Sequence, residues 1–168
     1  MHAAFRGTAR GRARGTAVAL FLSTFTNKVD RKGRVSVPAS FRAALAGQSF
    51  LGIVVYSSFQ LPCLEGADIE RMAEMSRRIE QLGQFTEAYG NLAATFADAQ
   101  QLSFDGEGRV MLPPTLAEYA GITDYAAFVG QGPTFQIWEP ERFARHQQER
   151  RSRARGLTLP PRAEGGFR

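Results

Sequence analysis

Apolar and polar positions follow three patterns along this 168-residue chain. The short stretch 34-RVSV-37 alternates between apolar and other side chains, which is typical of a strand, and the similar stretch 109-RVML-112 is predicted to form a strand too. Two longer apolar stretches, 50-FLGIVVYS-57 and 125-YAAFVG-130, also predict strands. Residues 66–97 instead carry apolar side chains at helical spacing, starting with Ile69, Met72, Met75, Ile79 and Leu82. The pattern therefore predicts an α+β fold.

The predicted elements fall into two similar units. Each unit has a first strand, a turn with glycine, a short alternating strand, a short helix opened by proline, and a final pair of strands. In the first unit these elements are 25–29, 34–37, 38–46, 50–57 and 58–61. In the second unit they are 101–104, 109–112, 113–120, 125–130 and 134–138. Gly47 and Gly121 are expected to end the two short helices.

Further helices are predicted between and after the units. Gly83 is expected to divide the segment 66–97 into two helices. The helical spacing continues after this glycine at Phe85, Ala88, Tyr89, Leu92 and Phe96. A last helix is predicted over 140–155, and residues 156–168 are expected to be disordered.

One sequence motif occurs in both units. The stretch 30-DRKGRVSVP-38 matches 105-DGEGRVMLP-113, which lies 75 residues later. A second match, 59-FQL-61 with 135-FQI-137, lies 76 residues apart. Two matches in the same order at nearly the same distance indicate an internal duplication. Because one unit is too small to bury a core, we expect the two to interleave in one barrel with pseudo-twofold symmetry.

The duplication divides the chain into five segments. Residues 24–71 and 99–142 are the two repeats, and residues 72–98 are the linker helices. Residues 143–168 are a basic C-terminal helix and a disordered tail. Residues 1–17, a low-complexity leader of Arg, Gly, Ala and Thr, are expected to be disordered or to come from a start codon placed too far upstream of a true start near Val18.

Charge is distributed unevenly along the chain. The formal net charge of +5 comes from the two ends, because 1–17 has four arginines and no acid, and 142–168 has eight arginines and two glutamates. The remaining residues are acidic overall, so the high isoelectric point alone does not indicate nucleic-acid binding. One stretch of this acidic body differs: 27–42 holds five basic residues and one acid, whereas 105–117 holds two acids and one arginine.

The sequence favours a cytoplasmic protein. No apolar stretch reaches the roughly 18 residues of a membrane span. The single Cys63 cannot form an internal disulfide, which suits a reducing compartment. A signal peptide is a weaker interpretation of the basic and apolar N-terminal stretch, because its apolar part is short and no small-residue cleavage site follows.

Candidate catalytic and metal-binding residues are few. His2 and His146 are both expected in the tails, and Cys63 has no partner for a thiolate site. No phosphate-loop or metal-ligand spacing occurs, so no catalytic residue, metal or cofactor is predicted. Asp30 and Asp105 could form an acid dyad across a pseudo-twofold axis, but each has an arginine four residues later, which favours structural pairing instead.

The basic loop of the first unit is the candidate functional site. Asp30, Gly33, Asp105, Gly108 and Arg109 are expected to fix two tight hairpins, in which Asp and Arg pair. The first hairpin adds cations that the second does without, so the fold alone does not require them. We therefore expect Lys28, Arg31, Lys32 and Arg34 to bind DNA.

The two motifs and their surroundings resemble the MraZ family of the AbrB/SpoVT swapped-hairpin superfamily. The resemblance rests on 23-STFTNKVDRKGRVSVPASFR-42, 105-DGEGR-109 and 121-GITDYAAFVGQGPTFQIWEPERF-143, and it covers roughly 18–150. The segment 57–71 departs from the pattern, because it lacks the aromatic residue that Trp138 supplies in the second copy.

The resemblance implies a fold: a duplicated swapped-hairpin β-barrel of the double-psi type, with linker helices and a C-terminal helix. It also implies a cytoplasmic, nucleoid-associated transcriptional regulator of the division and cell-wall gene cluster, expected to repress its own gene. Such a protein would bind direct promoter repeats in double-stranded DNA as a ring-shaped homo-oligomer, an octamer or larger. By the same resemblance, Arg34 is needed for DNA binding.

Two other functions remain open from the sequence. A double-psi-barrel enzyme would need a polar pocket with a nucleophile or cofactor. A ring scaffold would use the basic loop to bind an acidic protein surface. The C-terminal arginines could either contact DNA loosely or only solvate their helix.

Overall fold

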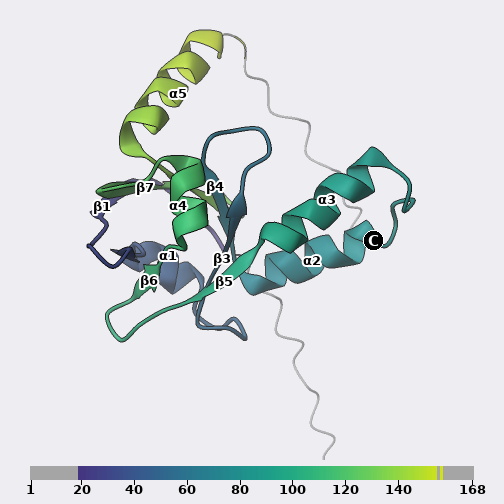
Figure 1. Cartoon of the computed structure of the whole chain (residues 1–168), viewed down its shortest axis with the longest axis horizontal. Coiled ribbons are helices and arrows are strands. Elements are labelled where there is room, and N and C mark those ends of the chain that lie inside the picture. Colours follow the sequence, from purple (N-terminus) through teal and green to yellow (C-terminus); the bar gives the residue numbers. More distant parts are fainter. Residues whose placement is uncertain (1–18, 155, 157–168) are drawn as a thin grey trace, which may run out of the picture.

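The structure, a computed structural model, describes residues 19–154 and 156 and has the predicted α+β architecture (Figure 1). The leader 1–17, the proposed start at Val18 and most of the tail lie outside the described residues. Along the described chain the elements are β1 (Thr24–Lys28), β2 (Arg34–Ser36), α1 (Ala39–Ala44), β3 (Gly52–Ser57), β4 (Leu64–Ala67), α2 (Ile69–Ile79), α3 (Glu87–Asp98), β5 (Gln100–Ser103), β6 (Arg109–Met111), α4 (Pro114–Ala120), β7 (Tyr125–Gly130), β8 (Phe135–Trp138) and α5 (Pro140–Arg153).

The strands form two antiparallel sheets. Six strands follow the order β1-β7-β8-β4-β3-β5, and β2 pairs with β6 in a second sheet. The first strand of each unit pairs with a strand of the other unit: β1 lies beside β7, and β5 lies beside β3. The last strands, β4 and β8, pair with each other at the centre. The two units therefore interleave, and neither has a complete sheet of its own.

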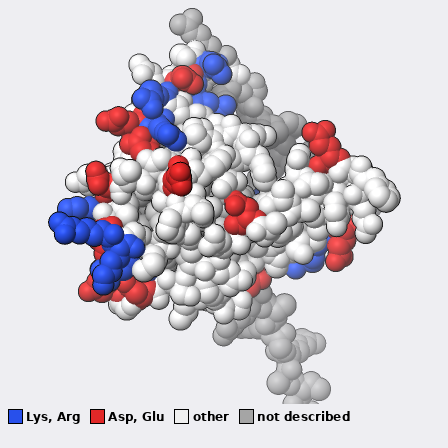
Figure 2. Space-filling view, viewed as in Figure 1, with Lys and Arg blue, Asp and Glu red and all other residues white. Residues whose placement is uncertain are grey.

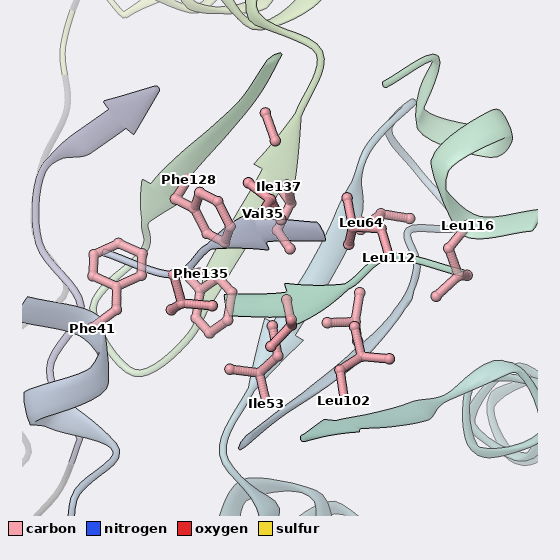
Figure 3. Packing of buried hydrophobic residues seen from close by; sticks show 14 of the residues in the cluster. Val35, Phe41, Ile53, Leu64, Leu102, Leu112, Leu116, Phe128, Phe135 and Ile137 are labelled. Atoms are coloured by element: carbon pink, nitrogen blue, oxygen red, sulfur yellow. The ribbon is translucent and has the colours of Figure 1, made fainter. Parts of the chain in front are cut away.

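Phenylalanine rings fill much of the main core, between the two sheets (Figure 3). The ring centroids of Phe21 and Phe135 lie 4.9 Å apart, and those of Phe41 and Phe135 lie 5.3 Å apart. Val35 and Val110 face each other across the β2–β6 pair, and both are fully buried. Burying each large side chain contributes about 1.5–3 kcal/mol, so residues of both units stabilise one shared core.

The two helices predicted within 66–97 are present as α2 and α3, with Gly83 in the turn between them. Asp68 caps α2 by accepting a hydrogen bond from the backbone N–H of Arg71 at 2.6 Å. The two helices project from the body as a hairpin (Figure 1). Phe85 was expected on the buried face of the second helix, but it lies before α3 and is fully exposed.

The predicted strand at 58–61 is wrong, because these residues form a loop and the strand lies at 64–67. Pro62 has no N–H to give to a strand ladder, and the side chain of Phe59 is exposed. Gly66 explains the position of the strand: a Cβ there would overlap the ring of Phe135 on β8, so this position needs glycine. The matching stretches 59-FQL-61 and 135-FQI-137 are therefore not equivalent in the structure, because the first is a loop and the second lies in β8.

The correct strand position reveals a second equivalence between the units. β4 and β8 lie at the centre of the sheet, 71 residues apart along the chain, and each leads directly into a helix with an acidic cap. These caps, Asp68 and Glu139, are also 71 residues apart, and 69-IERM-72 aligns with 140-PERF-143. Helix α2 is therefore the counterpart of α5, and α3 has no counterpart in the described chain.

None of the described helices is long and apolar enough to span a membrane.

Candidate functional site

The first hairpin joins β1 to β2 and is held by one carboxylate. Oδ1 of Asp30 accepts the backbone N–H groups of Lys32 at 3.0 Å and Arg34 at 2.9 Å. Its Oδ2 accepts Nε–H of Arg34 at 2.7 Å. Gly33 has φ +84°, a left-handed conformation that a side chain would strain. Asp30 thus fixes both the turn and the direction of the Arg34 side chain.

The second hairpin, between β5 and β6, has the same geometry. Oδ1 of Asp105 accepts the backbone N–H groups of Glu107 and Arg109, each at 2.9 Å, and its Oδ2 accepts Nε–H of Arg109 at 2.8 Å. Gly108 has φ +74°. The Asp–Arg pairing predicted for both motifs is therefore present in the structure.

The two hairpins are tied to each other. The carbonyl of Gly33 accepts the backbone N–H of Leu112 at 2.9 Å, and the carbonyl of Gly108 accepts that of Val37 at 3.2 Å. Together with the β2–β6 pairing, these reciprocal bonds join the units at the base of both loops. The backbone of either loop is therefore supported by the opposite unit.

Hydrogen bonds lower the pKa of both loop carboxyls. For Asp30 the largest cause is the backbone N–H of Arg34, with the Arg34 side chain adding to it. For Asp105 the largest cause is the backbone N–H of Arg109. The pKa of Arg109 is raised by its hydrogen bond to Asp105 and, more weakly, by Glu107 and Asp30. The charged form of Arg109 is therefore stabilised mainly within its own hairpin.

The surroundings of the two arginines differ. A terminal nitrogen of Arg109, Nη2, pairs with Glu107 at 3.0 Å. The terminal nitrogens of Arg34 make no hydrogen bond or ion pair with any described residue, and its side chain is 32% exposed. Arg34 is therefore oriented by its carboxylate and still has donors to offer, whereas Arg109 is neutralised within its own loop.

The other three predicted cations lie with Arg34 at the same end of the fold. Lys28, Arg31 and Lys32 are exposed and form no ion pair among the described residues. In Figure 2, Lys and Arg side chains gather at the left edge of the molecule, where Figure 1 places the end of β1 and the loop that follows it. The structure brings the four predicted residues into one basic loop.

Sequence reasoning missed two contributors to this site. Arg42, on α1, lies against Gly108 so closely that a Cβ there would overlap its guanidinium group. Asn27 donates its side-chain amide to the carbonyl of Ser36 at 2.7 Å, which links β1 to β2. Arg42 lies four residues, about one helical turn, after Pro38 of the first motif. This spacing could have indicated that its side chain returns toward the hairpins.

The described chain shows no group of three or more His, Cys, Asp or Glu residues that could hold a metal ion. Burial raises the pKa of Cys63 to about 12, so its thiol is protonated at neutral pH. His146 was expected in a tail, but it lies on α5 with its ring stacked on Trp138 at a centroid distance of 4.8 Å.

Comparison with known proteins identifies the family. The profile of the family described as "MraZ protein, putative antitoxin-like" matches residues 20–86 and 95–157. The chain belongs to the MraZ family. Each of the two matched MraZ blocks contains one Asp–Arg hairpin and one of the equivalent helices α2 and α5. The duplication inferred from the motifs thus agrees with the family pattern.

Curated MraZ relatives cover most of the chain. The protein from Gluconacetobacter diazotrophicus is 43% identical over 155 residues, which is 89% of this chain and 98% of the relative. Those from Gluconobacter oxydans and Rickettsia bellii are 44% and 45% identical, over 83% and 74% of this chain and 88% and 84% of the relatives. All three are named "Transcriptional regulator MraZ".

Proposed function

We propose that this protein is a sequence-specific DNA-binding transcriptional regulator whose DNA-contacting element is the β1–β2 loop. The names of its relatives support a role in transcription. The observation that carries the proposal is the contrast between two hairpins of the same backbone geometry. One presents unpaired cations, and the other neutralises its arginine with Glu107. On an acidic body, a basic loop is where a polyanion can bind.

The rest of the proposal concerns the target and the assembly. The protein represses the division and cell-wall gene cluster, including its own gene, and acts in the cytoplasm at the nucleoid. It binds direct repeats in promoter DNA as a ring-shaped homo-oligomer of eight or more subunits. Exposed apolar side chains support burial between subunits: Leu20, Leu22, Leu51 and Phe59.

We also propose that the fold is a swapped-hairpin barrel of the double-psi type. The exchange of β1 and β5 between the units supports this assignment. The reciprocal hydrogen bonds between the two hairpins support it further. In such a barrel the two loops would emerge at one end, where one can contact DNA while the other stabilises the first.

Exchanging the chemistry of the two loops tests the proposed function. Arg31→Gly with Lys32→Glu gives the first hairpin the residues of the second. Gly106→Arg with Glu107→Lys makes the opposite change, and the space around Gly106 is open, so the new side chain fits. Gel shifts would use DNA from upstream of the protein's own gene.

We expect the first pair of changes to weaken binding strongly and to lower the slope of log affinity against log salt by about 2, one for each cation removed from the phosphates. The second pair should retain binding. Circular dichroism and oligomer mass should stay the same for both. If the first variant bound like the wild type, the β1–β2 loop would not be the DNA-contacting element.

A further inference from the structure

A polar pocket of about 500 Å³ lies away from the two hairpins, at the base of α5. Its walls come from the start of β1, the β3–β4 loop, the end of β7 with the turn that follows, and one face of α5. Pockets for small ligands are commonly of about 300–1,000 Å³. This pocket is therefore large enough for a small metabolite.

The face that α5 turns toward the pocket is unusual for a helix beside a sheet. Phe143, His146, Gln147 and Arg150 line it, at the spacing of a single helix face. Such a face is normally apolar because it packs on the core. Here only the first residue is apolar, and α5 has no buried residue. The helix therefore presents hydrogen-bonding groups where packing alone would favour leucine or valine.

Much of the hydrogen-bonding capacity of the walls is unused. The side chains of Ser23, Thr24, Gln60, Gln147 and Arg150 line the pocket and form no hydrogen bond with the described residues. Ser23 also has φ +71° and is the one described residue other than glycine with a positive φ. Strained backbone of this kind clusters at ligand sites. The strain at Ser23 thus falls on the wall of the pocket.

The back of the pocket is held rigid by a chain of hydrogen bonds. Trp138 donates its indole N–H to Oε1 of Gln136 at 2.9 Å, and Gln136 donates its amide to Glu65 at 3.0 Å. The Gln136 amide is therefore fixed in one orientation. His146, which also lines the pocket, stacks on the same Trp138 ring. A ligand in the pocket would meet a preorganised wall, which reduces the entropic cost of binding.

The charge of the lining determines which ligand fits. Arg150 is the one Lys or Arg on the wall, and no Asp or Glu lines it. Amides and hydroxyls are suited to a ligand with several hydroxyl groups, and Phe143 offers an aromatic surface to a ring. We propose that this pocket binds an anionic sugar, a hydroxylated ring that carries one phosphate or carboxylate. The anion pairs with Arg150, and the hydroxyl groups bond to the glutamines and to Ser23.

This proposal is independent of DNA binding, because none of the residues of the basic loop lines the pocket. A ligand here would add contacts between α5, β7 and the β3–β4 loop, which already meet through Phe143, Val129 and Leu61. Bound ligand should therefore stabilise the position of α5.

Trp138 is the only tryptophan in the sequence and contacts two residues of the pocket wall, Gln136 and His146, so its fluorescence is a suitable signal for binding. The experiment titrates the full chain with glucose 6-phosphate and with glucuronate, the phosphate and carboxylate forms of the class. Neutral glucose and inorganic phosphate serve as the two halves of the ligand. Isothermal calorimetry is run in parallel, so that binding without a spectral change is still detected.

We expect saturable binding of at least one anionic sugar, about 10-fold or more tighter than glucose or phosphate alone, since a hydrogen bond to a charged group is worth roughly that factor. Arg150→Gln should remove the preference for the anionic form. Arg145→Gln is the matched control, because that arginine lies on α5 but not on the pocket wall.

The absence of saturable binding by both methods in the millimolar range would overturn the proposal. It would also be overturned if Arg145→Gln weakened binding as much as Arg150→Gln. The anion would then be attracted by the overall positive charge of α5 and not bound in the pocket. If only the phosphate form or only the carboxylate form binds, that result identifies the anionic group.

Discussion

Arg34 is bound twice by Asp30, once through its backbone N–H at 2.9 Å and once through its side-chain Nε–H at 2.7 Å. Neither bond uses a terminal nitrogen of the guanidinium group. The side chain is therefore held in a fixed direction while its terminal nitrogens stay available. A long, flexible side chain normally loses conformational entropy when it binds a ligand, and this pairing reduces that cost in advance.

Replacing Arg34 separates binding from folding. We expect Arg34→Ala to weaken operator binding by about 1–3 kcal/mol for each base that the arginine recognises, with little change in circular dichroism or oligomer mass. Arg109→Ala is the matched control, and it should lower the melting temperature more than it lowers affinity. The opposite result, loss of binding with Arg109→Ala in a folded oligomer and normal binding with Arg34→Ala, would reverse the roles of the two hairpins.

Acid should weaken the hairpins. Asp30 and Asp105 both have a pKa below the ordinary value of 3.8, since their charged forms accept hydrogen bonds in the folded state. Their stabilising contribution is therefore complete above about pH 3.8 and is lost as the pH falls through the lower pKa of the folded state. The free energy of unfolding should decrease with acidification in that window.

The double variant Asp30→Asn, Asp105→Asn cannot titrate at these positions. Its stability should be lower than that of the wild type at neutral pH and should depend less on pH below about 4. Urea unfolding from about pH 5 to about pH 2 would measure both curves. Parallel curves would mean that other carboxyls account for the acid sensitivity.

Two glycines should respond to substitution in opposite directions. At Gly66 an added side chain would overlap the ring of Phe135, and Gly66→Val should destabilise the protein by about 1–3 kcal/mol or more. Gly90 lies within α3, with no atom near its missing Cβ. Gly90→Ala should stabilise the protein by up to about 1 kcal/mol. Thermal unfolding of both variants is the measurement, and a neutral Gly66→Val would contradict the tight packing of β4 on β8.

The proposed ring predicts the arrangement of its DNA site. A closed ring joins its subunits head to tail, so neighbouring loops should read direct repeats rather than inverted ones. Repeats should recur about every 10 base pairs, so that adjacent loops meet the same face of the duplex. Affinity should rise steeply from one repeat to two. Footprinting on DNA with half a turn inserted should show that gain disappear, and equal affinity for both spacings would rule out this mode of binding.

The local features of the fold could be predicted from the sequence. Both hairpins follow from a motif of a few adjacent residues, in which Asp30 and Gly33 act on their own turn. The helices α2 and α3 follow from apolar spacing and from Gly83. The basic loop was also predictable, because comparing two copies shows which cations the fold does not need.

Features that depend on distant residues were predicted less well. The position of β4 depends on Phe135, which occupies the space beside Gly66 and lies far away in the sequence. The equivalence of α2 and α5 was not predicted, because equivalent residues lie 75 positions apart in the sequence at the motifs but 71 positions apart at the helices. Nor did any local pattern indicate that His146 would stack on Trp138 or that the inner face of α5 would line a pocket.

Because the two units exchange their first strands, the order in which the chain is synthesised determines when each strand can pair. β1 has its partner in β7, so the strand made first cannot be paired until residues near 130 have left the ribosome. β3 can pair with β4 inside its own unit, but its other edge stays open until β5, which follows α2 and α3, has been made. The N-terminal unit therefore emerges with an unpaired strand and exposed core residues. Until the second unit has been synthesised, the N-terminal unit lacks the strand that pairs with β1, so its part of the sheet stays incomplete.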